Sequence, residues 1–441
     1  MIKKLITGSF LSACSIFLLT SCKTPAALNG DMAVLPGDVS RIIQTLAADD
    51  MEGRGSFTPG IDKAAKFIEG EFKAAGLQPL KGLTGFRQSF EVIQSVPVST
   101  TVTINGEAIG ANGTFAIAGD SFKWDNTAGA EVVVIKPGEN FRKVFYEYYR
   151  GNKKALILVD PSFAPNFKQI KERLAAGSVS FTTDKAKQVV MVLGKFANTS
   201  KYSVSYEAKT PAKPLFNVAG MIPGKTKPDE YVIFSGHYDH LGIGGATTVA
   251  GDSIANGADD DASGTTAVIS LAKYYKKLGN NARTLIFVAF TAEEIGGYGS
   301  QYFSKQVDPD KTVAMFNIEM IGKASKFGKN SAFITGYDKS DFGTILQSNL
   351  KGTEFTFHPD PYPDQNLFYR SDNATLARLG VPAHTISTDE IDIDKFYHTV
   401  DDEFSTLDVN NITATIRAIA LSSRSIVSGK DTPKRIPKLA E

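Results

Sequence analysis

From residue 215 onward, short apolar strands alternate with amphipathic helical stretches. Strands are expected at 231–235, 284–291, 313–318, 332–335 and 381–386, with helical periodicity over 262–279, 297–306, 339–350 and 406–427. Such alternation needs helices that cross over a sheet between neighbouring strands. The pattern therefore predicts an α/β fold, a three-layer sandwich with a mostly parallel central sheet. A further amphipathic helix is expected at about 60–76, ended by Gly76.

Between residues 88 and 212 the pattern changes to short β-rich runs. Asn105-Gly106, after the run 102–104, is a strong signal for a hairpin turn. The length of 441 residues also favours two folded units over one. We therefore expect 88–212 to be an inserted β-rich domain, with 37–87 and 213–430 forming the α/β domain.

Polar residues gather where the predicted strands end. His237 and Asp239 follow the strand 231–235, and Glu293-Glu294 follow the strand 284–291. Asp259, Asp260 and Asp261 precede the helix 262–279, and Tyr397-His398 come late in the chain. The carboxyl ends of parallel strands meet at one edge of a sheet, which is where α/β proteins bind ligands.

Each of these segments has an ordinary explanation when taken alone. Aspartates cap helices, glutamate pairs occur in solvated turns, and histidines occur on surfaces. Together they are more specific, because three of the five histidines, His237, His240 and His398, fall among these acids. Histidine and carboxylate ligands suit zinc, and one carboxylate can bridge two ions.

The composition is that of a globular protein, with 42% hydrophobic and 22% charged residues. The net charge is +1, and no basic stripe or block of like charge appears. Nucleic acid is therefore not expected as a partner.

The N-terminus has the character of a targeting segment. Lys3 and Lys4 precede an apolar stretch over 5–19, which ends in small residues before Cys22. We expect 1–21 to be a lipoprotein signal peptide, Cys22 to be lipidated, and 22–36 to be a tether. The alternative is an ordinary cleaved signal peptide. Either way the protein is exported, and the lipid would anchor it to a membrane facing the periplasm or the cell surface. Cys14 and Cys22 are the only cysteines, so no thiol serves the folded body.

Taken together, these segments resemble those of a known family in order, spacing and local sequence. They are similar to the di-zinc exopeptidases that include secreted aminopeptidases and glutamate carboxypeptidases. The resemblance covers roughly 40–80 and 215–427, and it includes the segment Met51-Glu52-Gly53-Arg54-Gly55. By its position, 88–212 resembles the protease-associated insertion of many relatives.

The resemblance implies two zinc ions and a role for each motif residue. His237 would bind the first zinc, Glu294 and His398 would bind the second, and Asp260 would bridge the two. Glu319 stands where the family usually has an aspartate that binds the first zinc. Glu293 would be the general base, and Tyr397 would help to polarise the substrate carbonyl. Asp239 and Asp261 would support the ligands, and the bond between Asp260 and Asp261 would be cis.

The function implied is hydrolysis of peptide bonds at the ends of peptide substrates, most simply by an aminopeptidase. A carboxypeptidase or dipeptidase of the same fold is the alternative, because the sequence does not reveal which peptide terminus is bound. A glutaminyl cyclase is a further alternative, although such proteins resemble single-zinc sites. A non-catalytic binding protein on the peptidase scaffold is disfavoured, because Glu293 and four of the five expected ligands match the family pattern.

Overall fold

The computed structural model describes residues 1, 34–196, 199–245 and 251–439. Apart from Met1, the predicted signal peptide lies outside the described residues, as do Cys22 and most of the predicted tether. Among the helices of the described part, none is both long and apolar enough to cross a membrane.

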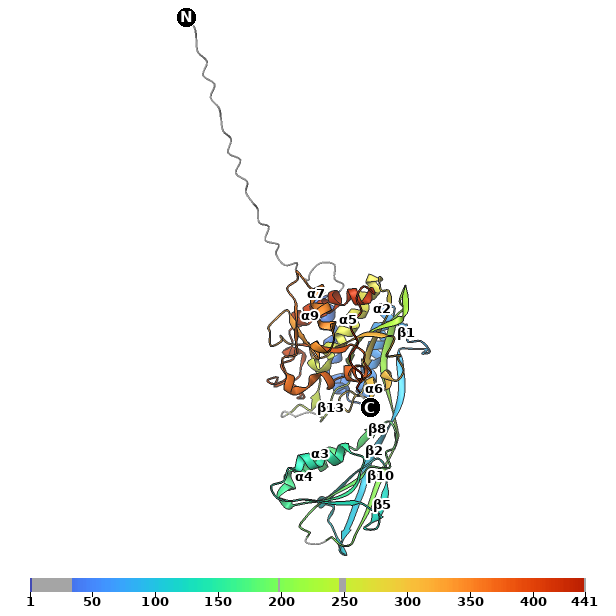
Figure 1. Cartoon of the computed structure of the whole chain (residues 1–441), viewed down its shortest axis with the longest axis vertical. Coiled ribbons are helices and arrows are strands. Elements are labelled where there is room, and N and C mark those ends of the chain that lie inside the picture. The colour runs from blue at the N-terminus through green and yellow to red at the C-terminus, as the bar shows by residue number, and fades with distance from the viewer. Residues whose placement is uncertain (2–33, 197–198, 246–250, 440–441) are drawn as a thin grey trace.

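The larger part of the molecule is a sheet between two layers of helices (Figure 1). Its strands, in spatial order, are β18 (Thr356–Pro359), β17 (Ser331–Ile334), β19 (Ala383–Ser387), β16 (Thr312–Ile318), β12 (Lys227–His237), β15 (Arg283–Phe290), β11 (Ala212–Ile222) and β2 (Arg87–Ile104). The centre, β19-β16-β12-β15, is parallel, whereas β17 pairs with β19, and β11 with β15, in antiparallel fashion. The predicted three-layer α/β fold is confirmed, with antiparallel pairs outside the parallel centre.

Residues that alternate along the central strands face two separate hydrophobic cores. In β12, Val232 and Phe234 belong to the core on one face, and Ile233 belongs to the core on the other. The first face is covered by α1 (Pro36–Leu46), α2 (Pro59–Ala75), α5 (Gly264–Leu278), α7 (Phe342–Asn349) and α9 (Val409–Ser422). The second carries α6 (Tyr298–Ser304) and α8 (Asn373–Arg378). Strands buried on both faces read as continuous apolar runs, which is why the sequence shows them so clearly.

One expectation about helices needs correction, and one helix was not expected. The stretch expected as one helix over 406–427 is two, α9 and α10 (Arg424–Val427), separated at Ser423. The helix α1 was not predicted, although Pro36 stands at its first turn, where proline is favoured. By contrast α2 ends where predicted, at Gly76, which adopts a φ of 77°.

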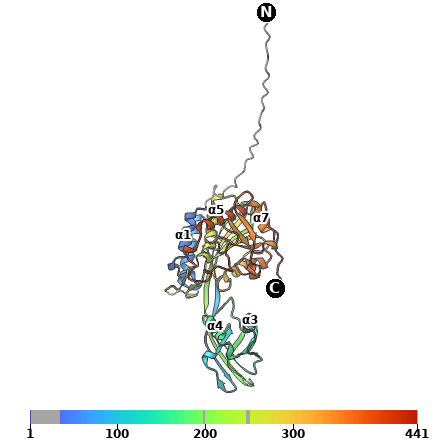
Figure 2. The same cartoon turned by 90° about the vertical axis from the view of Figure 1, so that its left-hand side faces the viewer.

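The segment between β2 and β11 forms a separate lobe with its own cores (Figures 1 and 2). Its strands include β4 (Thr114–Ala118), β5 (Phe122–Asp125), β6 (Glu131–Ile135), β7 (Lys154–Val159), β9 (Gln188–Leu193) and β10 (Tyr202–Lys209), with the short β3 (Glu107–Ala108) and β8 (Ser178–Ser180). The predicted hairpin at Asn105-Gly106 joins β2 to β3.

The lobe is rich in strands, as the sequence predicts, but it is not built of strands alone. It also carries the helices α3 (Phe141–Arg150) and α4 (Ala164–Leu174). Phe145, Tyr148 and other aromatic residues of α3 favour strands intrinsically, but here they pack one helix face onto the lobe's sheet. The lobe is joined to the main sheet by β2 itself, which pairs with β11 up to Ile93 and with β10 from Val96 onward.

Candidate metal centre

Three neighbouring strands bring the predicted residues to one edge of the sheet. β12 ends at His237, β15 ends three residues before Glu293, and β16 ends just before Glu319. The strands run parallel, with His237 opposite Phe290 and Ser235 opposite Asn317. The strand tips therefore lie side by side, and the segments that follow them converge on one place.

Asp260 lies at the centre of this cluster, with its two oxygens facing different histidines. Its Oδ1 is 3.1 Å from Nε2 of His237, and its Oδ2 is 3.3 Å from Nε2 of His398. The segment Ala258–Ser263, between β14 (Ile254–Ala255) and α5, carries this aspartate. The peptide bond between Asp260 and Asp261 is cis, as the resemblance implies.

Glu294 and His398 form a second pair of polar side chains beside Asp260. Oε2 of Glu294 is 3.2 Å from Nε2 of His398. His398 is in the left-handed backbone conformation, with a φ of 56°, and its ring stacks on that of Tyr397 with the centroids 3.9 Å apart. The structure thus brings His237, Asp260, Glu294 and His398 together from segments that are up to 161 residues apart in the chain.

Glu293, Glu319 and Tyr397 line a single cavity. Its wall also includes Asp260, Glu294 and His398, and further along it Phe333, Leu367, Arg370, Asp389 and Ile391. Glu319 therefore faces the same cavity as Asp260 and His398, despite its extra methylene group. Near it, the side-chain amide of Asn317 donates to Ser371 Oγ at 2.7 Å.

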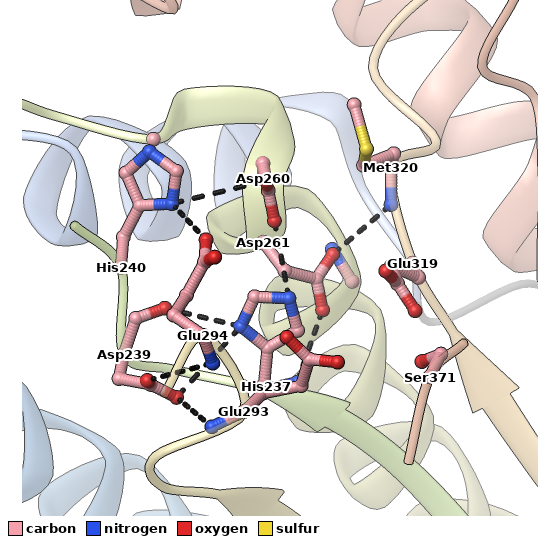
Figure 3. Close-up of polar contacts among 12 residues, drawn as sticks. His237, Asp239, His240, Asp260, Asp261, Glu293, Glu294, Glu319, Met320 and Ser371 are labelled. Atoms are coloured by element: carbon pink, nitrogen blue, oxygen red, sulfur yellow. Dashed lines mark hydrogen bonds and ion pairs between the residues drawn. The ribbon is translucent and has the colours of Figure 1, made fainter. Parts of the chain in front are cut away.

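Asp239 and Asp261 connect the segments rather than lining the cavity. Oδ1 of Asp239 accepts the backbone N–H of Glu293 at 3.0 Å, which ties the end of β12 to the segment after β15. His237 Nδ1 lies nearer to the backbone carbonyl of Asp239, at 3.1 Å, than to its carboxylate, at 3.8 Å. Asp261 accepts N–H groups from His237, Gly264 and Met320. Figure 3 shows how these contacts hold the loops around the cluster.

Crowded carboxylates dominate the electrostatics of the site. Burial raises the pKa of Glu293 well above its ordinary value, and raises that of Asp239 to about 6. Burial lowers the pKa of His398, but its contacts with Asp260 and Glu294 outweigh this and raise it to about 10. Carboxylates outnumber histidines here, so the site favours the binding of cations.

The spacing of the donor atoms fits zinc. Ligands of a tetrahedral zinc at bond lengths of about 2.0–2.1 Å lie about 3.3 Å from one another. Asp260 Oδ1 and His237 Nε2 are 3.1 Å apart, while His398 Nε2 is 3.2–3.3 Å from the facing oxygens of Glu294 and Asp260. Nε2 of His237 is buried without a hydrogen-bond partner in the described structure, which fits a nitrogen that binds a metal ion.

The sequence left His240 open between a supporting role and a surface position, and it gave no role to Asp372 or Asp402. His240 is buried, with Nδ1 2.7 Å from Oε1 of Glu294. Asp372 is buried near His237 and Glu319, and burial raises its pKa to about 7. Asp402 accepts the N–H groups of Asp259 and Asp260. Aspartates are common in loops and at helix starts, so the sequence around Asp372 and Asp402 does not reveal a role in the site. The position of His240 among acidic residues did offer such a signal.

Arg54 also supports the site from a distance. It is fully buried and donates to backbone carbonyls of Leu46, Tyr238, Asn256 and Gly257. It thereby ties the segment after α1 to the two loops that carry the histidines and aspartates.

Comparison with known proteins shows sequence similarity to peptidases. The sequence model of peptidase family M28 matches residues 217–422. Leucine aminopeptidase 1 of Penicillium rubens is 28% identical over 209 residues, which cover 45% of this chain and 52% of that protein. Carboxypeptidase Q of Mus musculus is 27% identical over 230 residues, or 48% of this chain and 42% of that protein. The chain thus spans about half the length of these curated relatives.

A solved structure supports the fold over nearly the whole chain. A zinc aminopeptidase from Bacillus subtilis superimposes with a TM-score of 0.56 and 15% identity, covering 91% of this chain and 97% of that one. At this identity the likeness shows the fold alone, while the sequence match covers the strands and loops that build the cluster. The chain therefore carries a peptidase family M28 domain over residues 217–422.

Proposed function

We propose that this protein is a zinc-dependent exopeptidase, and specifically an aminopeptidase. The observation that supports this most is the position of Asp260, whose two oxygens face His237 and His398, with Glu293 in the wall of the same cavity. A carboxylate placed to bridge two metal ions, beside a glutamate that binds neither ion and can accept a proton, suits hydrolysis at a two-metal site.

In this proposal the chain holds two zinc ions. His237, Asp260 and Glu319 would hold the first, and Asp260, Glu294 and His398 would hold the second. Asp239 and Asp261 would keep His237 and the neighbouring loops in place through the contacts described above. Zinc, when bound, acts as a Lewis acid on the peptide carbonyl and acidifies water.

The remaining chemistry falls to Glu293 and Tyr397. Glu293 takes a proton from the attacking water and returns it to the leaving amine, which suits a carboxyl group whose pKa is raised by burial. Tyr397 lines the cavity beside His398, and its hydroxyl donates to the oxygen that becomes negative during attack.

A carboxypeptidase or dipeptidase is the second candidate. It is favoured by the similarity to carboxypeptidase Q, whose identity is close to that of the leucine aminopeptidases. The two candidates differ only in which peptide terminus enters the cavity.

A substrate panel and a metal assay test the proposal together. The purified chain is assayed with leucyl anilide, with its N-acetyl derivative, and with an N-blocked dipeptide that has a free carboxylate. Zinc per chain is measured by mass spectrometry. We expect two zinc ions and hydrolysis only of the substrate with a free amine, with loss of activity on chelation and recovery on adding zinc.

The other results each contradict a named part of the proposal. Cleavage of the N-blocked dipeptide alone would establish the carboxypeptidase. Zinc binding without any hydrolysis would establish a binding protein on this scaffold. A single zinc per chain would overturn the two-ion assignment.

We further propose that the protein is an exported lipoprotein, anchored through Cys22, and that 88–212 is a protease-associated-type domain. The support for the anchor is the order of Lys3-Lys4, the apolar run and Cys22 in the sequence. A Cys22→Ser variant should lose metabolic labelling with palmitate and leave the membrane fraction. Unchanged labelling would refute the anchor.

A further inference from the structure

His240 lies behind the proposed second metal site, and no assigned role accounts for it. Its side chain is buried, and its Nδ1 is 2.7 Å from Oε1 of Glu294 and 3.8 Å from Oδ2 of Asp260 (Figure 3). Its Nε2 is also buried and has no hydrogen-bond partner within the part of the chain that the structure describes. A buried nitrogen without a partner is costly, so packing alone does not explain a histidine here.

The position of the ring is closely determined by its surroundings. The backbone N–H of His240 donates to the backbone carbonyl of Arg54 at 3.2 Å, and the backbone of His240 also forms a β-bridge with Gly55. Gly257 lies directly against the ring, because a Cβ added there would come within 2.5 Å of His240 Cδ2. The ring therefore has little room to turn away from Glu294.

The distances distinguish a hydrogen bond from shared metal ligation. Two ligands of one tetrahedral zinc lie about 3.3 Å apart, which is the spacing between His398 and Glu294 but not that between His240 and Glu294. A separation of 2.7 Å is that of a charge-assisted hydrogen bond. An ionised carboxylate has no proton to donate, so Nδ1 of His240 carries the proton of this hydrogen bond and Oε1 of Glu294 accepts it.

We propose that His240 is a positioning residue for the second zinc site. Its Nδ1–H holds Oε1 of Glu294, which leaves Oε2 directed at Nε2 of His398, 3.2 Å away. The inference rests on the proposed zinc centre and adds a residue that orients one of its ligands. Groups that orient metal ligands in this way contribute about 10- to 100-fold to metal affinity.

Three variants of the full chain test the inference. His240→Asn keeps an N–H donor near the place of Nδ1, whereas His240→Gln moves the donor to the place of Nε2, and His240→Ala removes it. Zinc affinity is measured by competition with chelators, and folding is checked by thermal unfolding. We expect one of the two zinc ions to bind about 10- to 100-fold more weakly in the Ala and Gln variants. The Asn variant should bind it nearly as tightly as the wild type.

His384→Asn is the matched control. This histidine is equally buried but hydrogen-bonds to Ser340 and Thr335, outside the cluster, so its loss should lower stability without changing zinc affinity. If the Ala variant does not fold, the comparison of Asn with Gln still decides.

Two results would overturn the inference while leaving the proposed function intact. One is wild-type zinc affinity in the Gln variant. The other is the loss of one imidazole ligand from the zinc X-ray absorption spectrum of the Ala variant, which would make His240 a direct ligand. A wild-type chain that binds no zinc would instead refute the proposed function itself.

Discussion

At the scale of single residues, the site brings together several carboxylates whose like charges would repel one another. Glu293 and Glu294 are adjacent in the chain yet have different surroundings. Glu294 contacts His240 and His398, which favour its ionised form, while Glu293 lies in the cavity wall with a pKa raised by burial. Environments that separate the protonation behaviour of neighbouring carboxyl groups are typical of acid–base catalysis.

Glu293→Gln should reduce kcat by about 10²- to 10⁴-fold, because the amide cannot accept the proton of the attacking water. Zinc content should stay at the wild-type level, since Glu293 is not among the proposed ligands. Glu294→Gln is the companion variant and should instead lose one zinc ion. Near-normal turnover by the Glu293→Gln variant would remove Glu293 from the mechanism.

His384 predicts a pH dependence of stability that arises away from the metal cluster. Burial lowers its pKa to about 4, below the ordinary value of about 6.5. The folded state thus binds fewer protons than the unfolded state between these values, so stability falls as pH falls through this window. The free energy of unfolding should decrease by roughly 2 kcal/mol between about pH 7.5 and about pH 5 from this group alone.

The measurement is chemical denaturation at both pH values, for the wild type and for His384→Asn. The variant should be less stable at the higher pH but should lose less stability on acidification. An equal loss in both proteins would show that His384 does not titrate as described.

At the scale of elements, the start of α5 is tightly packed against the end of β16 and against Asp261. Gly264 opens this helix, and a Cβ there would come within 2.1 Å of the carbonyl oxygen of Ile318 and 2.4 Å of Asp261 Oδ1. The helix, the end of β16 and the carboxylate that supports His237 therefore pack without room for a side chain.

Gly264→Ala should destabilise the protein by about 3 kcal/mol, although alanine is the better helix former. Zinc affinity should also fall, because Asp261 must move. Gly70→Ala, in α2, is the matched control, since an added Cβ meets nothing within 4 Å there and should stabilise by about 1 kcal/mol. Thermal and chemical unfolding measure the stability of both variants. A Gly264→Ala variant as stable as the wild type would contradict this packing.

At the scale of the whole molecule, the lobe between β2 and β11 has its own cores, continues the main sheet through β2, and packs against the larger part through Val179 and Phe181. Phe181 lies 6.1 Å from Phe90 and 5.3 Å from Tyr298, measured between ring centroids. Among the described residues, the cavity of the metal centre is lined only by positions between 260 and 398. The lobe and the site are therefore expected to be largely independent.

Replacing residues 95–210 by an Asn-Gly turn tests that independence. Gln94 and Pro211 are hydrogen-bonded across the strands, so a two-residue hairpin fits there. The shortened chain should fold and bind zinc as the full chain does, with a loss of about 2 kcal/mol from the missing aromatic contacts. Phe181→Ala in the full chain should show a similar loss. Failure of the shortened protein to bind zinc would make the two parts one folding unit.

The sequence by itself determined the elements whose physical cause is local. Strands buried on both faces, such as 284–291, need continuous apolar runs, and α2 needs its periodic face and Gly76, so both can be recognised without a partner. The candidate metal motifs were likewise visible because His and acidic residues at strand ends are chemically distinctive. The aromatic helix α3 was missed because its residues favour strands until a sheet is present to pack against.

Only the tertiary structure decided which polar groups share a site. The roles of His240, Asp372 and Arg54 depend on neighbours that lie 54, 53 and 184 residues away in the chain, at Glu294, Glu319 and Tyr238. No local pattern encodes such contacts, because they arise from the crossing of strands and loops. Hydrogen bonding and burial then set the charge and direction of each group, and these are properties of the folded chain.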